Sequence, residues 1–75
     1  MKEYTQKKLN DILYRYSNVE DIDDISELIS DITSTLRFIR GHMEYYDDKA
    51  VRQMFNIRQY LSLRRSKLAR KRRIA

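Results

Sequence analysis

The chain has 75 residues, a net charge of +5, no cysteine and no proline. This length fits one domain, and the composition excludes disulfides, thiolate metal sites and thiol nucleophiles. No apolar run approaches the ~20 residues that span a bilayer, and the N-terminus lacks the apolar core of a signal peptide, so the sequence predicts a soluble, cytoplasmic protein without a membrane partner.

The first predicted element is a short helix over residues 3–16. Ser17 and Asn18, which follow it, are typical of a turn. Four apolar side chains share one face of the helix at i, i+3, i+4 and i+7 spacing: Leu9, Ile12, Leu13 and Tyr16.

The strongest pattern predicts a long helix over residues 20–46. Ser17 and Glu20 have the spacing of a capping box, and Asp21 is an alternative N-cap. Gly41 lies away from the apolar seam and weakens a helix by about 1 kcal/mol relative to alanine, so we expect any break there. The seam has the unbroken 3-4 spacing of a coiled coil: Ile22, Ile25, Ile29, Ile32, Leu36, Ile39, Met43 and Tyr46.

The third predicted element is a helix over residues 49–72, which Asp47 or Asp48 can cap. Arg64 stands where its apolar seam would continue. The short connection before this helix predicts an antiparallel hairpin with the second helix. In that hairpin Leu36, Ile39 and Met43 are expected to face the third seam, which consists of Ala50, Val51, Met54, Phe55, Ile57, Leu61 and Leu68.

These elements predict an all-α fold. We expect a small three-helix bundle over residues 1–75, in which the short first helix packs on the long antiparallel hairpin and a basic tail follows. Formation of a homodimer through the heptad seam is the competing use of the same apolar residues.

Charge is segregated along the chain. Residues 49–75 contain ten bases and no acid, whereas residues 17–36 contain six acids and no base. Acids at a helix start and bases at a helix end both complement the helix dipole, and in a hairpin the two clusters would partly neutralise each other. That structural interpretation fits Arg64, Arg65 and Lys67 as well as a contact role does, but it fits Arg70 to Arg73 less well, because four adjacent bases point all round a helix.

The sequence predicts neither an enzyme nor a cofactor. His42 is the sole histidine, and without cysteine it lacks the partners of a metal site, so we interpret it as a residue of a helix face. The acidic residues lack the glycine and the alternate positions of a calcium loop. A single glycine excludes a glycine-rich phosphate loop.

Nucleic-acid binding is the function that the charge pattern favours, without separating DNA from RNA. Arg58, Arg65 and Arg72 share a helix face at seven-residue spacing and would present cations in a row. Arginine outnumbers lysine there, which suits bidentate contacts with phosphates and bases. The predicted phosphate-contacting residues are Arg58, Arg64, Arg65, Lys67, Arg70, Lys71, Arg72 and Arg73.

Aromatic side chains give a second, less specific signal. Those outside or at the margins of the seams would either stack on exposed bases or shield a small core. They are Tyr14, Phe38, Tyr45 and Tyr60.

The alternative function is a protein-binding regulator or inhibitor, of the kind that phages encode, that docks on a larger nucleoprotein machine. It would use the heptad seam or the acidic face of the second helix, which could mimic nucleic acid against a basic host protein. The acidic residues are Glu20, Asp21, Asp23, Asp24, Glu27 and Asp31.

One segment, residues 32–68, resembles the helical hairpin of ribosomal protein fifteen of the small subunit, which binds ribosomal RNA. His42 matches the first histidine of that family's loop motif. Tyr46 and Lys49 stand where the family has a second histidine and an aspartate. The later Arg-Arg-Leu-Leu pattern is also absent.

A shorter segment resembles the helical accessory domain that accompanies a T-even phage recombination helicase. The likeness rests on Asp47, Asp48, Val51 and Arg52, which match the entry to the third helix of that domain. Each resemblance covers under half of the chain, so we assign the chain to neither family. Both imply contact with nucleic acid.

Overall fold

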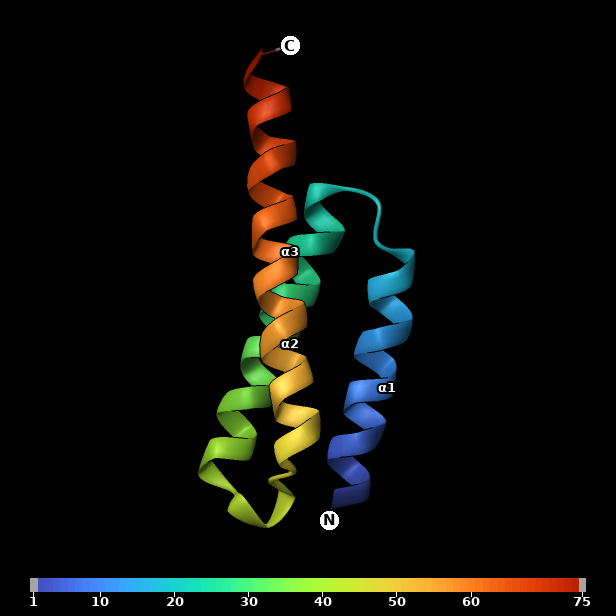
Figure 1. Cartoon of the computed structure of the whole chain (residues 1–75), viewed down its shortest axis with the longest axis vertical. Helices are drawn as coiled ribbons and strands as arrows, with labels where there is room; N and C mark the ends of the chain where they lie inside the picture. The colour runs from blue at the N-terminus through green and yellow to red at the C-terminus, as the bar shows by residue number, and fades with distance from the viewer. Residues whose placement is uncertain (1, 75) are drawn as a thin grey trace.

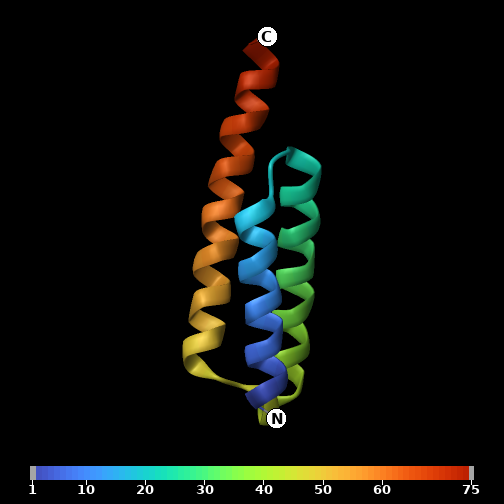
Figure 2. The same cartoon turned by 90° about the vertical axis from the view of Figure 1, so that its right-hand side faces the viewer.

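The computed structural model describes residues 2–74, with side chains for residues 2–70. Within this range the chain forms α1 (Lys2–Asn18), α2 (Ile22–Gly41), the short 3-10 helix η1 (Met43–Tyr45) and α3 (Asp48–Ile74). The first and third helices run in one direction and α2 runs in the other (Figure 1). Because α1 contacts both α2 and α3 (Figure 2), the predicted three-helix bundle is confirmed.

The core draws on all three helices, largely from the predicted apolar faces. Leu28 lies outside the predicted seam of α2 but is buried, whereas Ile29 and Leu36 are only half-buried. Leu13, predicted to face the core from α1, is exposed. On α2 the difference arises because this helix packs against both α1 and α3, so its buried face extends to Leu28 while Ile25, Ile32 and Ile39 remain buried as predicted. The buried side chains are Leu9, Ile12, Val19, Ile25, Leu28, Ile32, Ile39, Ala50, Val51, Met54 and Leu61.

The second helix is shorter than predicted: it ends at Gly41, and the helix expected over residues 42–46 is wrong. The chain instead turns through η1 and reaches α3, whose Val51 N–H donates to the Asp47 carbonyl at 2.9 Å. Met43 is 62% exposed and does not face Met54, which is fully buried.

Contacts with α1 explain why the chain turns there. The Thr5 hydroxyl, fully buried, donates a hydrogen bond to the Tyr45 carbonyl. The centroid of the Tyr45 ring lies 5.1 Å from the ring centroid of Tyr4 and 5.4 Å from that of Phe38. A continued helix would carry Tyr45 away from these partners, so tertiary packing overrides the local 3-4 pattern.

Replacing Gly41 by alanine is expected to stabilise the protein by about 0.4–1 kcal/mol. Gly41 does not have a positive φ angle, and a β-carbon at this position would meet no described atom within 4 Å. Alanine would therefore adopt the same backbone and reduce the entropy of the unfolded chain. Urea unfolding measures the change, and a loss of stability would show that the end of α2 requires glycine.

Asp21 is the N-cap of α2, so the predicted Asp21 cap is confirmed and the alternative capping box of Ser17 and Glu20 is not formed. Its side chain accepts a hydrogen bond from the Asp24 backbone N–H at 2.8 Å. Ser17 instead lies within α1, where its hydroxyl donates to the Leu13 carbonyl at 3.0 Å.

The substitution Asp21→Ala is expected to destabilise the protein by about 1 kcal/mol, because an N–H at the start of α2 loses its acceptor. The control is Asp23→Ala, which removes the same charge from the first turn of α2 without removing the cap. Thermal unfolding of both variants separates the two effects. Equal melting temperatures would mean that the cap contributes nothing beyond its charge.

Candidate nucleic-acid interface

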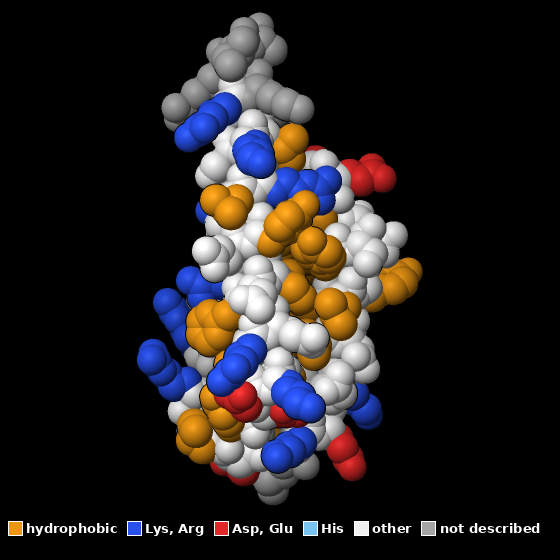
Figure 3. All heavy atoms as spheres, viewed as in Figure 1, with side chains coloured by type: hydrophobic (Ala, Val, Ile, Leu, Met, Phe, Trp, Pro, Cys, Tyr) orange, Lys and Arg blue, Asp and Glu red, His pale blue; other side chains and the backbone are white. Residues whose placement is uncertain are grey.

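The C-terminal end of α3 extends beyond the rest of the bundle (Figures 1 and 2). With 27 residues, α3 is longer than α2, which has 20. Its last fully buried side chain among the described ones is Leu61, and Leu68 packs at the margin of the core. After Leu61, Lys67 and Arg70 are exposed, and basic side chains lie over the upper part of α3 (Figure 3).

Direct ion pairs do not neutralise this region within the described side chains. Those present join Arg15 to Asp11 and Asp31, and Arg52 to Asp48. Arg65 lies beside the start of α2, yet its guanidinium donates to the Ser26 hydroxyl at 3.4 Å rather than to a carboxylate. The neutralising hairpin contact that the sequence allowed for Arg64, Arg65 and Lys67 is therefore absent as an ion pair.

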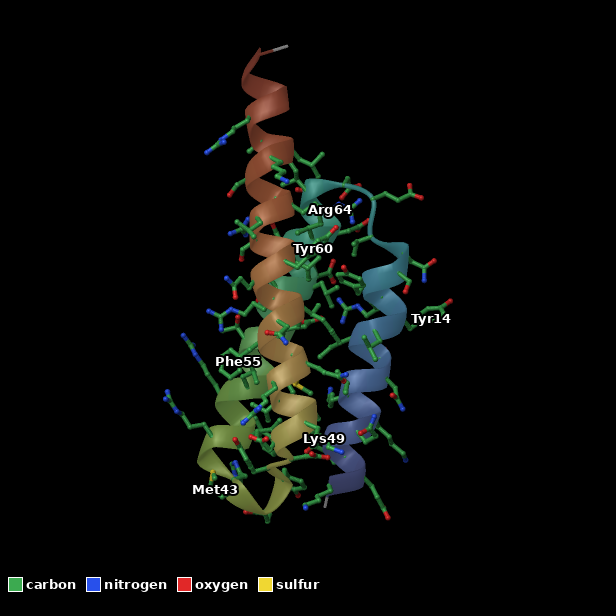
Figure 4. The ribbon with its side chains drawn as sticks, in the orientation of Figure 1. Tyr14, Met43, Lys49, Phe55, Tyr60 and Arg64 are labelled. Carbon is green, nitrogen blue, oxygen red and sulfur yellow. The ribbon has the colours of Figure 1, made fainter. Side chains whose placement is uncertain are left out.

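Arg64 follows Tyr60 by one helical turn on α3, at the base of the projecting segment (Figure 4). The rings of Tyr16 and Tyr60 are 5.6 Å apart. Burial raises the pKa of the Tyr16 phenol, the adjacent Tyr60 adds to this effect, and the charge of Arg64 opposes it. Tyr60 is itself exposed and lies four residues before Arg64, so an accessible aromatic ring and an arginine share one face of α3.

Arg58 does not belong to the same surface. It is half-buried and lines a groove between α2 and α3 together with Arg37 and Arg40. Arg37 and Arg40 were not among the predicted site residues, although their i, i+3 spacing beside the seam of α2 is visible in the sequence. The predicted side chains of Lys71, Arg72 and Arg73 lie outside the described residues.

The other aromatic candidates divide into two groups. Phe38 and Tyr45 pack with Tyr4 at the end of the bundle away from the basic segment, so they shield the core. Tyr14, on the outer face of α1, is 73% exposed.

All six predicted acidic residues are exposed, and two of them have structural partners. Asp21 caps α2, and Asp31 accepts a hydrogen bond from Arg15 at 2.6 Å. This hydrogen bond raises the pKa of the Arg15 guanidinium, and the contact joins α1 to α2. Glu20, Asp23, Asp24 and Glu27 complete the acidic surface.

His42 is the C-cap of α2 and packs against Phe38. Its Nδ1 lies 3.0 Å from the Phe38 carbonyl oxygen, and its ring stacks on that of Phe38 at a centroid distance of 4.3 Å. The described residues contain no group of three or more His, Asp or Glu side chains that could hold a metal ion. No described helix is long and apolar enough to cross a bilayer.

Comparisons of the chain with protein-family models, with curated proteins and with solved structures found no match. The two segment resemblances therefore gain no support from them.

Proposed function

We propose that this protein binds nucleic acid without catalysis, through phosphate contacts made by the C-terminal part of α3. The observation that carries the proposal is a projecting helix that has many bases and no acid beyond its first residue. Phosphate contacts require cations that can approach the backbone without steric obstruction, and a helix standing clear of its bundle provides them.

The described basic residues of α3 differ in how freely they can reach a phosphate. Lys67 and Arg70 are exposed and can reach phosphates directly, while Arg64 and Arg65 stand at the junction with the bundle. The sequence adds Lys71, Arg72 and Arg73 immediately after them. Tyr60, exposed beside Arg64, offers a ring on which an unpaired base can stack.

Fluorescence anisotropy tests the proposal and names the substrate class. Labelled single- and double-stranded DNA and RNA would be titrated with the protein at two salt concentrations, with polyglutamate as an unlabelled competitor. We expect binding that weakens by on the order of 100-fold or more between ~50 and ~200 mM salt, since several phosphates are neutralised. Absence of binding to all four nucleic acids at low salt would refute the proposal, as would complete displacement by an equal charge concentration of polyglutamate.

A further inference from the structure

A groove of about 520 Å³ runs between the C-terminal half of α2 and the N-terminal half of α3, and it has no part in the proposed function. No residue of α1 lines it. Ile39 and Val51 lie at its base, and Leu36, Met43 and Phe55 line it further out. Figure 4 labels Met43 and Phe55 at this edge of the molecule.

The apolar surface in this groove is the uncovered half of the heptad seam of α2. Alternate seam positions, such as Ile32 and Ile39, are buried in the bundle. The intervening positions turn outward: Leu36 is half-buried, Met43 is 62% exposed, and Phe55 across the groove is 51% exposed. Large apolar side chains that are exposed together in one groove mark a contact surface.

The groove is also positively charged. Three arginines line it, Arg37 and Arg40 from α2 and Arg58 from α3, and its lining contains no acidic residue. None of the three forms an ion pair with a described side chain. Basic and hydrophobic side chains lie together along the corresponding left edge of Figure 3. The groove therefore complements a partner that is both apolar and acidic.

We propose that this groove binds an acidic amphipathic helix of another protein, which would pack against α2 and α3 as a fourth helix. The pair α2 and α3 already accepts a helix, α1, on its other side, so a second helix packs by the same geometry. Apolar residues one and two turns apart on the partner would contact Met43, Leu36 and Phe55. Its flanking carboxylates would pair with the three arginines.

A second copy of this chain fits the groove poorly. A symmetric dimer would bring Arg37, Arg40 and Arg58 of both copies together, which like-charge repulsion disfavours. The largest acidic cluster of the chain, Glu20 to Asp31, lies at the start of α2, where Ile25, Leu28 and Ile32 are buried in the bundle, so it offers no free apolar helix face to a second copy. Nucleic acid is less suited because most of the apolar lining is aliphatic, from Leu36, Ile39, Met43 and Val51, and a sugar-phosphate backbone has no apolar face to cover it.

Three synthetic helical peptides of about 16 residues provide the test, each with leucines at i, i+3, i+4 and i+7 spacing. Their flanking positions are all Glu, all Gln or all Lys. The intact protein, with labelled methionine methyl groups, is titrated with each peptide and with a single-stranded oligonucleotide, and affinities and NMR shifts are measured. Met43 reports the groove and Met54 reports the core.

The Glu peptide is expected to bind at least ~10-fold more tightly than the Gln peptide and to shift the Met43 signal more than that of Met54. The variant Arg37→Glu/Arg40→Glu should lose this binding, whereas the matched variant Lys2→Glu/Lys7→Glu on α1 should keep it. Equal affinities for the three peptides, no binding of the Glu peptide at ~1 mM, or an oligonucleotide that displaces it from Met43 would overturn the proposal. Because the C-terminal bases are unchanged, nucleic-acid binding can fail or succeed independently.

Discussion

Replacing Leu61 by alanine is expected to destabilise the protein by about 2–5 kcal/mol, which is comparable to the whole stability of a domain this small. Leu61 is fully buried where α3 packs on the other helices, beside the core that Met54 and Ile32 also build. Its truncation removes apolar contacts and leaves a cavity that the surrounding helices can only partly close. Much of the variant should therefore be unfolded at 37 °C.

The same substitution two residues later provides the control. Leu63 is 59% exposed on the same helix, so Leu63→Ala is expected to change the free energy of unfolding by less than about 0.5 kcal/mol. Circular dichroism during urea unfolding gives both values. Similar losses at the two positions would mean that α3 does not pack on α2 in the described orientation.

Changing Arg70, Lys71, Arg72 and Arg73 to alanine is expected to weaken nucleic-acid binding by on the order of 100- to 1,000-fold near 0.1 M salt. Each phosphate contact contributes about 0.9 to the slope of log affinity against log salt for duplex DNA, so the slope should fall by about 3–4. Alanine favours helices, and Arg70 is exposed, so the fold should be retained.

The matched variant removes four positive charges elsewhere. Lys2, Lys7 and Lys8 on α1, and Lys49 at the start of α3, are exposed and lie toward the opposite end of the molecule. Their replacement by alanine should change the slope by less than 1, because they make no phosphate contact in the proposed complex. If both variants lose the same affinity, binding depends on net charge and not on the end of α3.

The sequence predicted the helices better than their ends. Apolar spacing follows from the helical repeat alone, so the three helices and their antiparallel order could be predicted. The end of α2 depends on a hydrogen bond between Thr5 and Tyr45, which are 40 positions apart, and on the ring contacts of Phe38 and Tyr4. Local patterns carry no information about such a contact.

Of the two candidate surfaces, one could be predicted from local sequence and the other depends on tertiary packing. A run of bases such as Arg70 to Arg73 is visible in one segment of sequence, so the basic end of α3 could be predicted. The groove required the rotation of α2 against α3, which decides that Leu36 faces outward and Leu28 inward. The i, i+3 spacing of Arg37 and Arg40 is visible in the sequence, but the groove that they line appears only with the helices packed.

An NMR titration of the labelled protein with its preferred nucleic acid tests the central proposal most directly. If the end of α3 binds phosphates, the backbone amide signals from Arg64 to Arg70 and of the residues that follow should shift most, while those of Lys2 to Lys8 on α1 should not move. Shifts concentrated on α1 or on the groove around Arg40, or no shift at low salt, would contradict the proposal.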